Sequence, residues 1–200
     1  MNLWQLPVTV ELCGRCYNLN TDFRDILELM GYLEDPQLPE PVRWLIALGL
    51  FYREPVPPEH RQAASEYLCR FLCCGMQDTP GPKLLDWQHD APAIIAGVNQ
   101  AAGQELRSLP YVHWWSFLGW FHAMGPGQLS TLVSIRDRLR RGKPLEDWQR
   151  EYYRNNRKAV DLPVRYSPEE QRQRAQLQAL LDGPGQTKEE AVYEDTKYWL

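Results

Sequence analysis

Apolar residues recur at helical spacing along most of this chain, and they are densest over residues 109–124. There the large side chains follow three- and four-residue steps, which places them on one face of a helix. The residues on that face are Tyr111, Trp114, Trp115, Leu118 and Phe121. Because Phe117 and Trp120 lie off this face, the helix is apolar on more than one side, as is typical inside a bundle.

We therefore expect a buried helix with Pro110 at its first position, where no N–H partner is needed. The stretch is too short and too polar for a membrane span, which needs about 20 mostly apolar residues. Its expected role is to pack the core against several neighbouring helices, with no reaction centre inside.

Capping residues, prolines and apolar periodicity predict further helices. Their approximate ranges are 22–30, 42–52, 58–74, 90–102, 128–141, 144–160 and 168–181. Asn20 or Thr21 is expected to cap the first of these helices, and Gly31 to end it. Asp90 is expected to cap the helix over 90–102, and Pro144 to open the arginine-rich one.

Alternating apolar and polar residues at Val8–Leu12 and Tyr17–Leu19 predict a β-hairpin, with a glycine-containing turn between them. A lone hairpin is marginal in water, so it must pack on the helices or pair with another chain. Its exposed edge is where we expect self-association through strands. The predicted fold is mainly α: a compact bundle of about six to seven helices with an N-terminal hairpin over residues 1–162. A C-terminal helix and a flexible acidic and aromatic tail follow over residues 163–200.

Composition changes this picture little. The hydrophobic fraction of 44% is ordinary for a globular protein. No basic region followed by an apolar run occurs at the N-terminus, so no signal peptide is expected. Five cysteines without a secretory signal indicate free thiols in a reducing cytoplasm.

Charge is distributed unevenly along the chain. Residues 1–59 contain 4 basic and 9 acidic side chains, whereas residues 131–160 contain 9 basic and 4 acidic ones. Such opposed patches favour docking between copies, or of the tail onto the body, over binding of nucleic acid. In the basic segment Arg138, Arg141 and Arg154 are candidate partner-binding residues, and the acids between them indicate an ion-paired surface.

The cysteines suggest one metal hypothesis. Cys13 and Cys16 are separated by two residues, and Cys69 and Cys73 lie one turn apart on a predicted helix. Four thiolates would close a tetrahedral zinc site. The alternative, which we favour, is that the first pair flanks the hairpin turn and the second fills the core, so no metal or other cofactor is expected.

Catalytic chemistry has weak support. His113 and His122 are nine residues apart, which places them on opposite faces of one helix, so they cannot share a metal ion there. A hydrogen-bonded structural role is expected for His113. The sequence has no zinc-protease, phosphate-loop, nucleophile-elbow or dinucleotide motif, and we expect no enzymatic activity.

Several short segments follow one another in a distinctive order. They are Asn20-Thr21-Asp22-Phe23-Arg24, Asp86-Trp87-Gln88-His89-Asp90-Ala91 with Ile94, His113-Trp114-Trp115 with Phe117, Ile135-Arg136, and Tyr152-Tyr153 with Asn155 or Asn156. In this order they resemble the bacteriophage gene product 15 family of siphophage tail-gene clusters. The resemblance covers about residues 8–162, and its most specific parts are 86–95 and 113–117.

The resemblance implies a mainly helical, non-enzymatic tail assembly chaperone whose partners are the phage tape measure protein and further copies of itself. Such a protein coats the tape measure in the cytoplasm of the infected bacterial host, is displaced as tail tube subunits polymerise, and is absent from the mature virion. The alternatives are a structural virion component, such as a head–tail connector or tail terminator, and a generic helical adaptor.

The tail lies outside this resemblance. Acidic segments that end in aromatic residues often dock into a partner groove. Candidate contacts to a neighbouring copy or to the tape measure are therefore Tyr193, Tyr198, Trp199 and Leu200. A tail that contacts no partner is the alternative.

Overall fold

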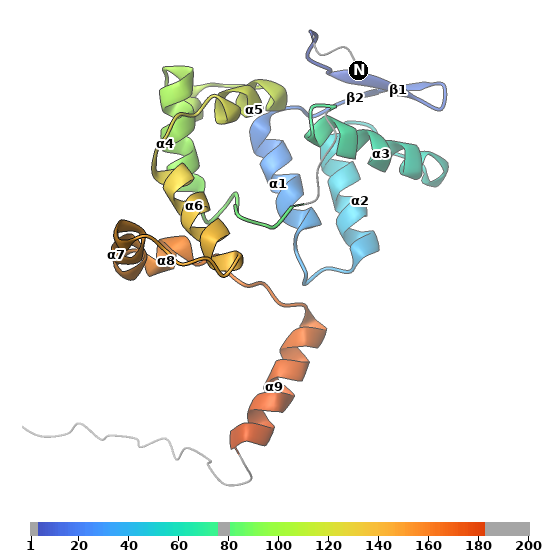
Figure 1. Ribbon diagram of the computed structural model, residues 1–200. Coiled ribbons are helices and arrows are strands. Elements are labelled where there is room, and N and C mark those ends of the chain that lie inside the picture. Colours follow the sequence, from blue (N-terminus) through green and yellow to red (C-terminus); the bar gives the residue numbers. More distant parts are fainter. Residues whose placement is uncertain (1–3, 76–80, 183–200) are drawn as a thin grey trace, which may run out of the picture. The chain divides into compact units, whose positions relative to one another are not determined.

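The computed structural model describes residues 4–75 and 81–182, and they are mainly helical as predicted (Figure 1). Contacts divide the chain into two units, Met1–Arg165 and Tyr166–Leu200, and each is described by itself. Among the described residues, none of the helices combines the length and apolar character that a membrane crossing requires.

The predicted hairpin is present. Strands β1 (Thr9–Leu12) and β2 (Arg15–Asn18) pair antiparallel, with Val10 opposite Tyr17. Cys13 and Gly14 form the turn between them with φ angles of 51° and 76°, the left-handed conformation that a tight hairpin turn requires at both positions. Three side chains at its inner face are buried against the helices, and these are Leu12, Tyr17 and Leu19.

The larger hydrophobic core lies under this hairpin. It joins α1 (Phe23–Leu33), α2 (Glu40–Phe51), α3 (Arg61–Leu72) and α5 (Trp114–His122), with a single 3₁₀ turn at Pro58–His60 before α3. Each helix contributes fully or nearly fully buried side chains. They include Ile26, Leu29, Phe51, Leu68, Phe71, Trp114 and Phe117.

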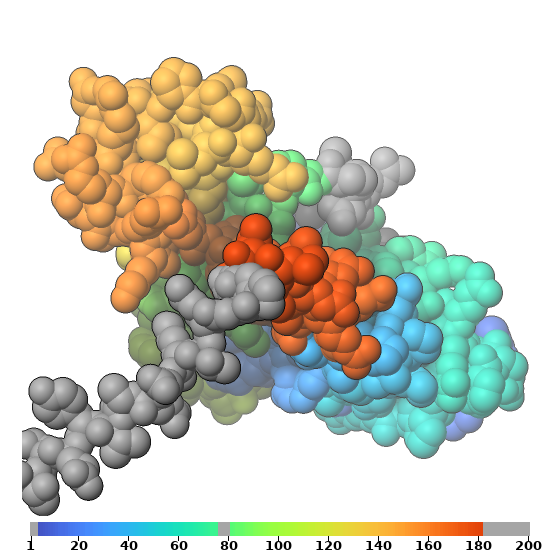
Figure 2. Space-filling view, turned by 90° about the horizontal axis from the view of Figure 1, so that it is seen from below, coloured from blue at the N-terminus to red at the C-terminus, as the bar shows by residue number. Residues whose placement is uncertain are grey.

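A smaller core holds the C-terminal part of the first unit. It joins α6 (Gln128–Arg140), α7 (Asp147–Asn155) and α8 (Arg157–Val160) to one side of α4 (Ala91–Ala102). Its buried side chains are Ala93, Leu132, Ile135 and Val160. Helix α4 also contributes to the larger core and so links the two. The 3₁₀ turn Leu106–Ser108 connects it to the chain before α5. Figure 2 shows α6–α8 (yellow to orange) and α2–α3 (cyan to teal) on opposite sides of this unit.

Two helix boundaries near the N-terminus differ from the predictions. Asp22, and neither Asn20 nor Thr21, caps α1, because its carboxylate accepts the N–H of Arg24 at 3.0 Å. Gly31 does not end this helix, which continues to Leu33. A glycine inside a helix costs only about 1 kcal/mol, and the buried face of α1 offsets that cost.

The arginine-rich segment also differs. It forms two helices, and Pro144 lies before the first of them, which begins at Asp147. Glu146 occupies the N-cap position without a side-chain cap bond, and its N–H donates to Gln149 Oε1 at 3.1 Å. A break at Asn156, with φ of −124°, then separates α7 from α8.

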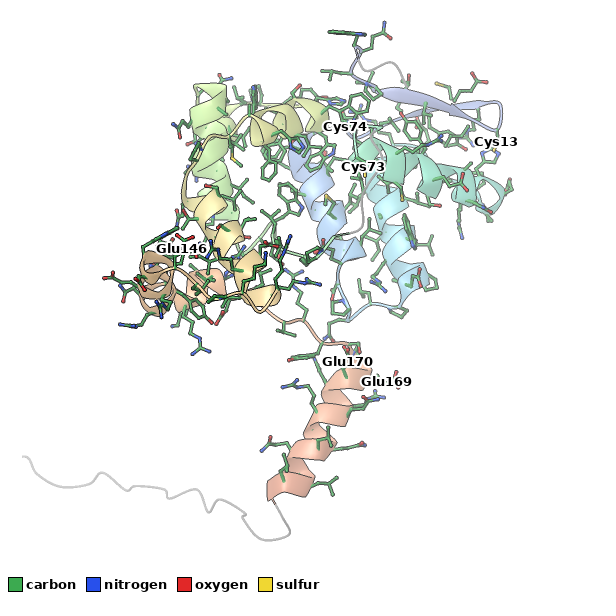
Figure 3. All side chains as sticks on the ribbon, in the orientation of Figure 1. Cys13, Cys73, Cys74, Glu146, Glu169 and Glu170 are labelled. Atoms are coloured by element: carbon green, nitrogen blue, oxygen red, sulfur yellow. The ribbon has the colours of Figure 1, made fainter. Side chains whose placement is uncertain are left out.

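The second unit contains α9 (Pro168–Asp182), which begins as predicted. The N–H of Glu170 donates to Ser167 Oγ at 3.2 Å, and the N–H of Ser167 donates to the Glu170 carboxylate at 2.7 Å, a reciprocal cap. Glu169 and Glu170 lie in the first turn (Figure 3). The Arg174 guanidinium lies 4.3 Å from the centre of the Tyr166 ring.

Candidate functional site

Two of the distinctive sequence segments meet where α1 and α5 begin. The N–H of Trp114 donates to Thr21 O at 2.8 Å, and the N–H of Phe23 donates to Val112 O at 2.9 Å. Asp22 adds a third link, because its carboxylate accepts the N–H of Val112 at 3.0 Å. These residues hold together segments about 90 positions apart.

His113 is the N-cap of α5 and is buried. Its Nδ1 accepts the N–H of Trp115 at 3.0 Å, and its Nε2–H donates to Pro7 O at 3.1 Å. One neutral tautomer satisfies both bonds. The ring also packs edge-on against Phe71, with ring centres 5.7 Å apart. His113 is therefore hydrogen-bonded as predicted, and it connects the N-terminal segment to α3 and α5.

The predicted start of the aromatic helix is wrong. Pro110 precedes the helix, and α5 begins at Trp114 because the His113 side chain supplies the cap. Tyr111 does not lie on the buried face: it is 51% exposed, and its hydroxyl bonds Thr21 Oγ1 at 2.6 Å. The indole N–H groups of Trp114 and Trp115 donate to the last carbonyls of α3, at 3.1 and 2.9 Å.

We expect the stability of the fold to fall as the pH drops below about 6.5, the usual pKa of histidine. Burial lowers the pKa of His113, although its bond to Pro7 opposes that shift. Below about pH 6.5 the unfolded chain therefore binds more protons than the folded chain. The stabilisation is present above about pH 6.5 and is lost as the pH falls through the pKa of His113 in the folded protein. Urea unfolding at a series of pH values measures this effect.

The matched variants are His113→Asn, which keeps an oxygen acceptor at the cap, and His122→Asn at an exposed position. His113→Asn is expected to flatten the pH dependence, and His122→Asn to leave it unchanged. If the stability of His113→Asn depends on pH as steeply as that of the wild type, His113 is not the cause of the pH dependence.

A buried ion pair joins α4, α6 and α8. The Arg136 guanidinium binds both oxygens of Asp90 at 2.7 Å, and both side chains are at most 5% exposed. Its remaining bonds go to the carbonyls of Leu84, Ala159 and Val160, at 3.0, 2.8 and 2.7 Å. Asp90 occupies the predicted cap position but makes no side-chain cap bond, because Arg136 and the N–H of Asp86 occupy its carboxylate.

Asp86 extends this ionic cluster toward the surface. Burial alone would raise the pKa of its carboxyl, but N–H donors from His89 and Gln88 and the charges of Arg165 and Lys83 lower the pKa below its ordinary value. Arg165 lies 3.1 Å from the Asp86 carboxylate. The segment over residues 86–91 and the Ile135-Arg136 segment are thus brought together in the interior, which the sequence analysis did not predict.

The exposed cations of the basic segment lie on α6, α7 and α8 and in the turn after α6, and together we call them the basic face. Four of its arginines pair with neighbouring acids, and the pairs are Arg138–Glu146, Arg141–Asp137, Arg150–Asp147 and Arg157–Asp161. Four other cations of this face are exposed and form no ion pair within residues 4–75 and 81–182: Arg140, Lys143, Arg154 and Lys158. Of the three predicted partner-binding arginines, only Arg154 belongs to this second group.

The structure does not assemble the hypothetical zinc site. In the described part of the chain, no three His, Cys, Asp or Glu side chains lie close enough together to hold a metal ion. Cys13 lies in the hairpin turn, away from Cys73 (Figure 3). The second pair does not fill the core either, since Cys69 is exposed and Cys73 is half-buried. The predicted contacts at Tyr193, Tyr198, Trp199 and Leu200 lie outside the described residues.

Comparison with known proteins identifies one family. The family model described as bacteriophage Gp15 protein matches residues 4–162. Searches of curated proteins and of solved structures gave no match. The matched range includes the α1–α5 junction, the buried ion pair and the basic face. The chain therefore belongs to the bacteriophage Gp15 protein family, whose members are phage structural or morphogenesis proteins.

Proposed function

We propose that this protein is a tail assembly chaperone that binds the phage tape measure protein. The family and the resemblance to proteins of siphophage tail-gene clusters support this function. The observation that carries the proposal is the basic face, because its unpaired cations offer binding energy that the fold itself does not use. We further propose that the protein is non-enzymatic and needs no cofactor.

The chemistry of the basic face suits an amphipathic helix with acidic flanks. Leu139 lies next to Arg140 on α6, Trp148 lies on α7 with Arg154, and the two apolar residues are 40% and 51% exposed. Apolar anchors bordered by charge are the features by which a groove or face binds a partner helix. The charges also raise the encounter rate and fix the orientation of the partner.

Reversing two cations of the basic face is expected to weaken tape-measure binding at least about tenfold, because charge reversal replaces attraction with like-charge repulsion. The test variant is Arg154→Glu with Lys158→Glu. The control is Arg61→Glu with Arg172→Glu, which makes the same change in net charge at exposed sites elsewhere. The measurement is co-expression with the neighbouring tape measure fragment, followed by size-exclusion chromatography.

The same experiment includes a chain that lacks residues 183–200, which tests the proposed contacts of the tail. Loss of co-elution in the basic-face variant alone supports that face as the binding surface. Co-elution of both charge variants with unchanged tape-measure solubility contradicts it.

Mass spectrometry of purified virions separates the chaperone from a structural virion component. We propose that the protein acts in the host cytoplasm and is absent from virions, whereas stoichiometric presence favours a connector or terminator.

A further inference from the structure

The hairpin has one covered edge and one open edge. Beyond β2, the N–H of Arg53 donates to Asn18 O at 3.0 Å, and the N–H of Asn18 donates to Glu54 Oε2 at 2.9 Å. Leu19 also pairs with Tyr52 in an isolated bridge. The chain that follows α2 therefore occupies the outer edge of β2, and an added strand cannot bind there.

The backbone of β1 exposes its other edge. The N–H of Leu19 donates to Val8 O at 2.9 Å, so Val8 and Leu19 form a hydrogen-bonded pair. Hydrogen-bonded and non-hydrogen-bonded pairs alternate along an antiparallel ladder. Val8, Val10 and Leu12 thus direct their backbone groups toward β2. Thr9 and Glu11 direct theirs away from β2, and in the described part of the chain these groups have no backbone partner beyond the hairpin.

A groove follows this open edge. It consists of two hollows of about 480 and 310 Å³, the first lined by residues 5–11 with Tyr67 and Trp115, the second by residues 10–12 with Tyr67, Arg70 and Gly75. Tyr67 lines both hollows and β2 lines neither. The space therefore lies beside β1 on the side away from β2, where an additional strand would pair.

We propose that this groove binds β1 of a second copy, antiparallel about a two-fold axis at Val10. In this register Thr9 lies opposite the partner's Glu11, and the two strands exchange four backbone hydrogen bonds. Moving the axis to Glu11 places two like charges opposite each other. Moving it to Thr9 places Pro7 opposite the partner's Glu11. Pro7 has no N–H, and its carbonyl already accepts from His113.

The inner faces of the two strands are complementary in this register. Val8 lies beside the partner's Leu12, and Val10 lies beside the partner's Val10. Val8 is 53% exposed in the single chain, and the second copy covers it. The four-stranded sheet that results also removes the open edge, which proteins otherwise protect against unwanted pairing.

Disulfide trapping tests the register. In a background with Cys13→Asn, Cys16→Ser and Cys69→Ser, the variant Val10→Cys is expected to form a covalent dimer under mild oxidation. Directly opposed residues in this position lie about 4.5 Å apart at their Cα atoms, within the range for a disulfide. The control is Val8→Cys, which is more exposed but lies about 13 Å or more from its symmetry mate at about 3.3 Å per residue. Equal cross-linking of both variants, or of neither, overturns the proposal.

The oligomeric state provides the second test. Light scattering of the purified full-length chain is expected to show a concentration-dependent dimer. Thr9→Pro removes an N–H that the hairpin does not use, and it is expected to weaken dimerisation at least about tenfold by deleting two interstrand bonds. Thr9→Val keeps that N–H and is the control. A strictly monomeric wild type, or equal dimerisation of both variants, overturns the proposal whether or not the tape measure is the partner.

Discussion

Replacing Arg136 by alanine is expected to lower the free energy of unfolding by about 3–5 kcal/mol, because it leaves Asp90 charged and buried without its partner. The substitution also removes donors from the carbonyls of Leu84, Ala159 and Val160. Those carbonyls belong to the segment before α4 and to α8, so both elements lose hydrogen bonds to α6. Total stabilities are usually about 5–15 kcal/mol, and the loss is therefore a large share. Urea unfolding measures it.

A double-mutant cycle separates the ion pair from the packing around it. Asp90→Ala with Arg136→Ala is expected to cost clearly less than the sum of the two single variants, because neither charge is then left alone. Arg141→Ala is the control. It removes an exposed pair with Asp137, and such a pair contributes at most about 1 kcal/mol. Additive costs across the cycle would contradict a coupled pair.

Local sequence patterns were sufficient for the elements that depend on near neighbours. The hairpin follows from its alternation and its Gly14 turn, and α9 follows from the Ser167 cap with acids in the first turn. The helical fold and the family were likewise predicted, and both are confirmed. These features need few contacts between distant residues, which is why the sequence alone predicts them.

Features set by distant partners were not predictable in the same way. Pro110 satisfies the local rule for a helix start, yet α5 begins four residues later because His113 caps it and Thr21 accepts the Trp114 N–H. One signal was available for the buried pair: Arg136 follows Leu132 by four residues on the apolar side of α6. An arginine on an apolar face predicts a buried partner, but not that Asp90 is the partner.

Replacing Phe117 by alanine is expected to cost about 3–5 kcal/mol of unfolding free energy, the usual range for a fully buried phenylalanine. Its side chain is 1% exposed and contacts rings from three parts of the chain. The ring centres of Phe23, Trp114 and Trp87 lie 4.9, 5.5 and 6.1 Å away. The substitution therefore opens a cavity where the distinctive segments around residues 23, 87 and 114 converge. Thermal and urea unfolding measure the loss.

Two controls establish that the loss comes from packing. Phe117→Leu keeps most of the volume but no ring, so its cost is expected to be clearly smaller than that of alanine. Trp148→Ala removes a larger ring from an exposed position on α7, and it is expected to change stability by at most about 0.5 kcal/mol. If the aromatic cluster serves only to hold the fold, Phe117→Leu binds the tape measure fragment like wild type under conditions where it is folded. Weaker binding by that folded variant would instead place part of the partner surface on the α1–α5 junction.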